Sequence, residues 1–241
     1  IKVFSWIIAI IYIGIIGLLF LVKMAKAPKE VKSQREMYRS IALFFYLYIG
    51  VRMFFLLSDF ERNANCESVL YFQFVFVAYI CSILAFLSII NFGEKYIIKK
   101  TKHKITYAVI ICVIIDVIIV SFFPLIIDSI IAQRFGENYT QEQFQDTLIL
   151  VGNIVRYFNY AIQYSTGLFL LMIYIYLAVK SAGKLRQNAI ITLIGLIIAV
   201  VASFLETDAL LASGVTPPFL SPILFCAGIS IFAYAYLRTI R

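Results

Sequence analysis

The sequence predicts an all-α, polytopic membrane protein: a seven-transmembrane-helix bundle with its N-terminus outside and its C-terminus in the cytoplasm. Three observations lead to this prediction. Hydrophobic residues make up 63% of the 241 residues and charged residues only 14%, whereas about a quarter of an ordinary soluble domain is charged. Apolar runs of about 20 residues, the length that a helix needs to cross the hydrocarbon, recur along the chain. The loops between these runs alternate in charge.

The apolar runs predict seven helices in one domain that spans residues 1–241. A β-barrel would instead show short segments of alternating hydrophobicity. The expected helices cover residues 3–22, 40–58, 68–92, 105–127, 141–180, 188–206 and 218–237.

Loop charge sets the predicted orientation. The loops after the first, third and fifth expected helices are rich in Lys and Arg, and those after the second, fourth and sixth are acidic or polar. Cytoplasmic loops carry the excess of basic residues, so the N-terminus is expected outside. The net charge of +8 therefore comes from basic loop residues that set the topology and contact anionic lipid headgroups. It is not interpreted as a nucleic-acid-binding surface. The expected location is the cell membrane, and the expected partners are the lipid bilayer and a cytoplasmic signalling protein on the basic loops.

Local signals refine two of the helices. Thr140 and Gln143 form the pattern of a capping box, which predicts that a helix begins at residue 141. A helix over 141–180 is about 60 Å long at about 1.5 Å per residue, so it is expected to project from the bilayer or to tilt. Pro124 predicts a kink or break in the fourth helix, and the segment after it is expected at the outer interface.

The sixth expected helix has a face of small residues. Gly195, Ala199 and Ala202 lie on this face together with Glu206. Small residues at helical spacing are typical of close contact between membrane helices. We therefore expect Glu206 to point into the bundle and not into lipid.

The fifth expected helix carries a polar stripe. Its members step by three and four residues, so they share one helix face that must avoid lipid. They are Asn153, Arg156, Asn159, Tyr160 and Gln163.

Three more ionisable residues lie at similar depth in the predicted bundle: Arg52, Asp116 and Glu206. One interpretation pairs each arginine with an acidic residue, as structural ion pairs that clamp the helices. The other is a polar pocket that opens outward, with Asp116 as its floor and the polar stripe as its wall. Both interpretations remain open at this level, and the abundant tyrosines are better explained by packing and interface belts.

The layout is shared by microbial rhodopsins, G-protein-coupled receptors and the seven-helix sensor modules of some histidine kinases, but none of their motifs is present. The last expected helix has no lysine for a retinal Schiff base, and His103 is the only histidine, which disfavours haem and zinc. No cofactor is expected. Without a nucleophile and base in a recognisable pattern, an enzyme is not expected either.

The sequence thus favours a receptor or sensor that binds a small ligand from the outer side. A channel or transporter that uses Asp116 for ions or protons is the alternative, followed by a non-catalytic structural subunit of a membrane complex.

Overall fold

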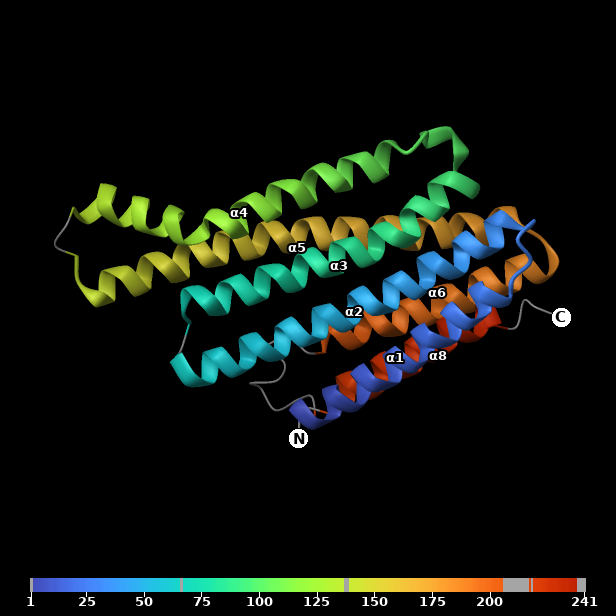
Figure 1. Cartoon of the computed structure of the whole chain (residues 1–241), viewed down its shortest axis with the longest axis horizontal. Coiled ribbons are helices and arrows are strands. Elements are labelled where there is room, and N and C mark those ends of the chain that lie inside the picture. The colour runs from blue at the N-terminus through green and yellow to red at the C-terminus, as the bar shows by residue number, and fades with distance from the viewer. Residues whose placement is uncertain (1, 66, 137–138, 206–216, 218, 238–241) are drawn as a thin grey trace.

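The chain folds into a bundle of long helices (Figure 1). The computed structural model describes residues 2–65, 67–136, 139–205, 217 and 219–237. A short 3-10 helix, Lys99–Thr101, lies between α3 and α4. The α-helices are α1 (Lys2–Lys26), α2 (Lys32–Asn65), α3 (Val69–Tyr96), α4 (Lys104–Phe135), α5 (Gln141–Lys180), α6 (Gly183–Phe204) and α8 (Leu220–Leu237).

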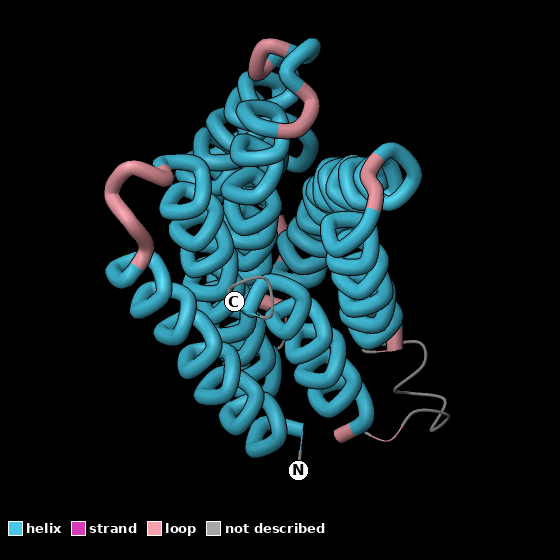
Figure 2. Tube along the Cα trace, turned by 90° about the vertical axis from the view of Figure 1, so that its right-hand side faces the viewer, coloured by secondary structure: helices cyan, strands magenta, loops and turns pink. Residues whose placement is uncertain are grey.

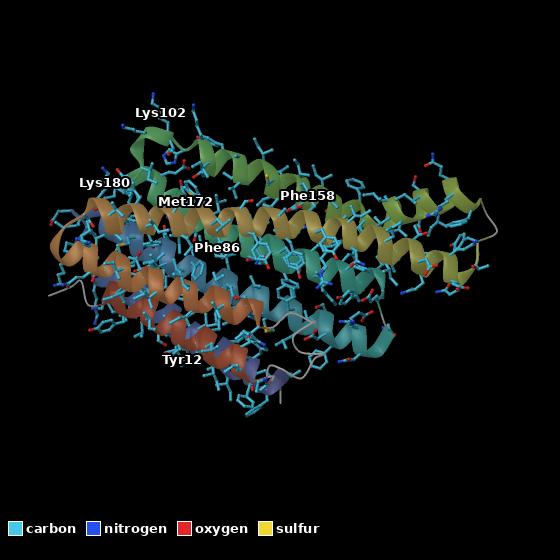
Figure 3. All side chains as sticks on the ribbon, turned by 180° about the vertical axis from the view of Figure 1, so that it is seen from behind. Tyr12, Phe86, Lys102, Phe158, Met172 and Lys180 are labelled. Carbon is cyan, nitrogen blue, oxygen red and sulfur yellow. The ribbon has the colours of Figure 1, made fainter. Side chains whose placement is uncertain are left out.

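Seven helices within the described residues are long and apolar enough to cross a membrane. Many of their large apolar side chains point away from the bundle, as Phe158 and Met172 of α5 do in Figure 3. Such a surface suits lipid and not water. The predicted all-α bundle of seven apolar helices is confirmed and is that of a multi-pass membrane protein. The direction in which the chain crosses remains a prediction.

Most helices extend beyond the apolar runs that predicted them, because a helix does not end where the hydrocarbon ends. The fifth helix has the predicted bounds, and Thr140 and Gln143 form both hydrogen bonds of the expected capping box. In Figure 1, α4 and α5 together extend past α2 and α3 at one end of the bundle.

Of the kink or break predicted at Pro124, the break is wrong, whereas α4 does bend part-way along its length in Figure 1. The α4 helix continues through Pro124 to Phe135, so the segment after the proline is part of α4. Phe123, Ile127 and Ile131 form one buried face there and join a cluster with α3 and α5 side chains. This packing favours a continuous helix despite the hydrogen bond that proline removes.

The helices form two layers that meet at both edges. One layer runs α1, α2, α3, α4, and the other runs α8, α6, α5; α1 packs against α8 at one edge, and α5 packs against α3 and α4 at the other. Figure 2 shows this arrangement from the end of the bundle at which α1 leads into α2. Within the described residues, no extensive packing joins α2 to α6 across the middle. The layers therefore leave interior space there.

The α6 and α8 helices are in close contact beside this space. A methyl group added at Gly195 would lie 2.6 Å from the Gly228 carbonyl oxygen, so the two backbones touch. Ala199 and Ala202 are buried beside them. The predicted small-residue contact is confirmed, whereas Glu206 lies outside the described residues.

Candidate functional site

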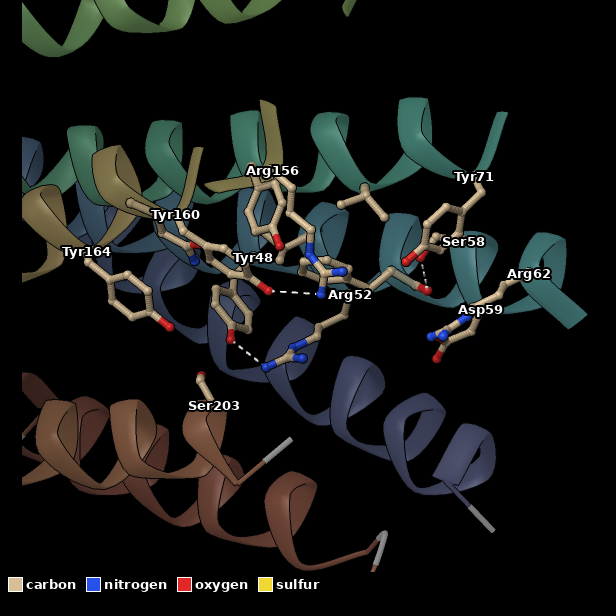
Figure 4. Close-up of a pocket in the computed structure, with 15 residues that line it drawn as sticks. Tyr48, Arg52, Ser58, Asp59, Arg62, Tyr71, Arg156, Tyr160, Tyr164 and Ser203 are labelled. Atoms are coloured by element: carbon tan, nitrogen blue, oxygen red, sulfur yellow. Dashed lines mark hydrogen bonds between the residues drawn. The ribbon is translucent and has the colours of Figure 1, made fainter. Parts of the chain in front are cut away.

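A cavity of about 230 Å³ lies between α2, α3, α5 and α6 (Figure 4). We call it the polar cavity. Its walls carry a concentration of arginine and tyrosine side chains. The polar side chains that line it are Tyr48, Arg52, Ser58, Asp59, Arg62, Tyr71, Tyr79, Arg156, Tyr160, Gln163, Tyr164 and Ser203.

Arg156 enters the polar cavity from α5. Its Nη2 donates a hydrogen bond of 3.1 Å to the hydroxyl of Tyr160, one helical turn further on. Its Nε atom is buried and has no hydrogen-bond partner among the described residues. A buried, unsatisfied donor on a cation is costly, and the Arg156 side chain also lines the cavity.

Arg52 enters the same cavity from α2. Its Nη2 donates to the hydroxyl of Tyr48, one turn earlier, at 2.8 Å. The guanidinium carbon lies 3.7 Å from the ring centroid of Trp6 on α1, close enough for a cation–π interaction. Tyr48 in turn stacks on Phe225 of α8, with 4.5 Å between ring centroids. Three helices thus fix the position of one arginine.

The α3 helix orients the α5 side chains. Tyr79 packs edge-on against Tyr160, with 5.0 Å between ring centroids. Ser82 accepts a hydrogen bond of 2.9 Å from Gln163 Nε2. The polar stripe of α5 therefore turns toward α3 and the cavity, as the sequence predicted for its Arg156, Tyr160 and Gln163 members.

Among the described residues, the charge of the cavity lining is mainly positive. The ionisable groups of this described lining, besides the tyrosines, are three arginines and one carboxylate, Asp59. Arg62 also lies 3.7 Å from Glu67 at the end of the bundle, so Arg52 and Arg156 provide the deeper cationic groups. Charges act strongly on each other in a poorly solvated site, and arginine suits carboxylate and phosphate oxyanions.

The predicted site residues fall into three groups: those that line the polar cavity, those that do not, and Glu206. Arg52, Arg156, Tyr160 and Gln163 line the polar cavity. Asn153 is half-buried and does not line it. Glu206 lies outside the described residues, so a contact between Glu206 and either arginine stays a prediction.

Asp116 does not form the floor of this cavity, contrary to the sequence interpretation. It lies on the buried face of α4, and α4 makes its extensive contacts with α3 and α5 only. Neither of its carboxylate oxygens has a hydrogen-bond partner among the described residues. Asn159 is also buried away from the cavity lining, where its Nδ2 donates to the Val155 carbonyl oxygen.

The other interpretation, an ion pair of an arginine with Asp116, is likewise not found in the described part of the chain. The partner of Arg156 is a tyrosine hydroxyl, and Asp116 forms no salt bridge there. The tyrosines around the cavity are what the sequence interpretation underestimated. A local signal existed: Tyr48 precedes Arg52 by four residues and Tyr160 follows Arg156 by four, so each pair shares a helix face.

A second cavity, of about 330 Å³, adjoins the first. We call it the apolar cavity, because its lining is almost entirely aliphatic, aromatic or glycine and comes from α2, α3, α5, α6 and α8. The two cavities share the residues Tyr48, Gln163, Tyr164 and Ser203. In the described residues, no three His, Cys, Asp or Glu side chains come together as ligands for a metal ion.

No protein-family model, curated protein or solved structure matches this chain.

Proposed function

We propose that the protein is a seven-helix receptor or sensor of the membrane that binds a small anionic ligand in the polar cavity. The observation that carries the proposal is Arg156. Its side chain lines the cavity, and the hydrogen-bond partner of its guanidinium among the described residues is a tyrosine hydroxyl and not a carboxylate. An oxyanion in the cavity would pair with this cation and offset the cost of its partly buried charge.

The surrounding groups support an anion over a cation or a neutral molecule. Arg52 and Arg156 reach the cavity from opposite layers of the bundle, and tyrosine hydroxyls lie beside both. Guanidinium and hydroxyl groups together donate hydrogen bonds to carboxylate or phosphate oxygens. With the predicted orientation, the cavity lies in the outer half of the bundle.

Ligand binding at this position supports a receptor role because the cavity lies between layers. The α2 and α6 helices lack extensive packing against each other, so an anion held between the two layers changes the balance of forces across the gap. Both helices begin at the predicted cytoplasmic end. If the ligand favours one spacing of the layers, the conformation with that spacing becomes more populated. The change then reaches the predicted cytoplasmic end, where both helices begin.

Thermal unfolding of the purified chain in nanodiscs tests anion binding, with butyl phosphate as the probe. Butyl phosphate should raise the unfolding midpoint of the wild type. Arg156→Gln should weaken its binding at least tenfold, because a hydrogen bond to a charged group contributes about 1.5–3 kcal/mol.

Arg134→Gln is the matched control. Arg134 is an exposed α4 arginine outside both cavities, so its removal should leave the affinity within twofold. If butyl phosphate, inorganic phosphate and butanoate all leave the midpoint of the wild type unchanged, the proposed anion site is wrong.

A further inference from the structure

The apolar cavity continues the polar cavity toward the predicted cytoplasmic half of the bundle. Arg156 lines only the polar cavity, whereas Gly167 and Leu171, about three and four turns further along α5, line only the apolar one. Gln163 and Tyr164 lie between them and line both. The combined space therefore has a cationic end and an apolar end along a single helix.

Glycine positions give the apolar cavity its shape. Gly195 and Gly228 hold the backbones of α6 and α8 in contact, which fixes one wall. At Gly167 on α5, an added methyl group would approach only Phe86, at 3.9 Å. The missing side chain at Gly167 thus leaves space inside the bundle and not merely room for a neighbouring backbone.

The apolar cavity reaches the lipid-facing surface of the bundle. Leu168 lines the cavity and is 61% exposed, and Tyr164 lines both cavities and is 45% exposed. A hydrocarbon chain can therefore enter from the bilayer between these side chains. An alkyl chain in this space would make dispersion contacts with its apolar lining.

We propose that the anionic ligand is a single-chain amphiphile, with its carboxylate or phosphate head between Arg52 and Arg156 and its alkyl tail in the apolar cavity. The assignment rests on the proposed anion site and adds the chemical class of the ligand. The combined dimensions fit one chain, because the apolar cavity is one space of about 330 Å³, near the lower end of the range of about 300–1,000 Å³ for small-ligand pockets.

The experiment compares alkyl phosphates that share the phosphate head group and differ in the length of the alkyl chain. Butyl, hexyl and octyl phosphate are titrated onto the purified chain in nanodiscs, and their affinities are measured. The free concentrations are corrected for partition into empty nanodiscs. Affinity should rise by about threefold to fourfold per methylene, the gain for burying one methylene from water. Octanol, which keeps the tail and lacks the charge, should bind at least tenfold more weakly than octyl phosphate. Octanoate against octyl phosphate then distinguishes a carboxylate from a phosphate ligand.

Gly167→Leu fills the apolar cavity and leaves the polar cavity unchanged. In this variant butyl phosphate should bind within twofold of the wild type, and the gain with chain length should disappear. Ile154→Leu, on the lipid-exposed face of α5 outside both cavities, is the control and should retain the gain.

The outcomes separate the two proposals. If butyl phosphate binds and octyl phosphate binds no better, the amphiphile assignment is overturned and the anion site stands. If no anion binds, the anion site fails and the assignment fails with it.

Photolabelling provides a test without cavity variants, with octyl phosphate that carries a terminal diazirine as the probe. Labels should fall on residues 167–171 or 195–200, and labels confined to the outer surface of α4 contradict the proposal.

Discussion

The two deep arginines share a local arrangement in which a tyrosine one helical turn away accepts a hydrogen bond. A tyrosine hydroxyl orients a guanidinium without neutralising it, whereas a carboxylate would do both. Within the described residues, Arg156 has this hydroxyl as its hydrogen-bond partner and forms no salt bridge, so its positive charge is not neutralised there. This difference between orientation and neutralisation separates a binding site from a structural ion pair.

Asp116 presents the opposite case, because it is buried on α4 with no hydrogen-bond partner within the described residues. Asp116→Leu should therefore raise the free energy of unfolding by about 1–3 kcal/mol, since the cost of burying an unsatisfied polar group disappears. Denaturant unfolding in detergent measures the change.

Thr166→Val is the control for Asp116→Leu. Thr166 is a buried α5 residue whose hydroxyl is already bonded to the Ile162 carbonyl oxygen, so this change should bring no gain. A loss of stability in Asp116→Leu above 1 kcal/mol contradicts the unpaired state of Asp116. Proton flux in liposomes that is abolished by Asp116→Asn would instead favour the transport alternative.

The sequence predicted which of these residues share a helix face better than it predicted their neighbours in other helices. Periodicity placed Arg156, Tyr160 and Gln163 on one face, and that face does line a cavity. Asp116 was predicted at a similar depth, but α4 packs against α3 and α5 instead of α2 and α6. Which helices surround a given face depends on the packing of the whole bundle, and this information is absent from the local pattern.

Between elements, one buried carboxylate connects α3 to α4. The side chain of Glu94 on α3 accepts hydrogen bonds from the backbone nitrogens of Ile105 and Thr106, at 3.1 and 2.7 Å, and another from the Thr106 hydroxyl. It thus caps the first turn of α4, where backbone donors lack helical partners. The sequence interpretation missed this role because the contact crosses a loop.

Glu94→Gln should destabilise the docking of α4. One of the two carboxylate oxygens is replaced by an amide donor that cannot accept the backbone bonds, so the expected loss is about 1–3 kcal/mol. Hydrogen exchange at Ile105 and Thr106 should become faster.

Glu36→Gln offers the matched comparison at the same end of the bundle. Glu36 forms a partly exposed salt bridge with Lys95, and such pairs contribute about 0–1 kcal/mol. Equal losses for the Glu36 and Glu94 variants would show that Glu94 does not act as a cap.

Helix boundaries show the same division between local and distant information. The start of α5 was predictable because Thr140 and Gln143 specify it within four residues. The continuation of α4 beyond Pro124 was not, since it coincides with packing of Phe123 and Ile127 against side chains distant in the sequence.

Over the whole molecule, the two layers touch at their edges and enclose the cavities between them. Lys102 and Lys180 mark the end of the bundle that the charge pattern predicts to be cytoplasmic (Figure 3). The α2 and α6 helices both begin at this end and belong to different layers. A change in the spacing of the layers at the cavity should therefore reach their first turns.

Spin labels at Lys32 on α2 and Lys184 on α6 test this transmission in a variant without the four native cysteines. Both lysines are exposed. Butyl phosphate should shift the distance distribution between the two labels, because the ligand alters contacts between layers. When Arg156→Gln is added to the spin-labelled protein, the distance distribution should not shift at butyl phosphate concentrations that shift it when Arg156 is present.

Labels at Lys32 and Lys102 provide the control within one layer, where α2 packs against α3 and α3 against α4; their distance should stay constant. If butyl phosphate binds and neither pair of labels responds, the protein binds anions without signalling across the bundle. The receptor role then fails, although the anion site remains. A shift confined to the Lys32 and Lys184 pair would identify movement between layers as the step that connects the cavity to the basic end.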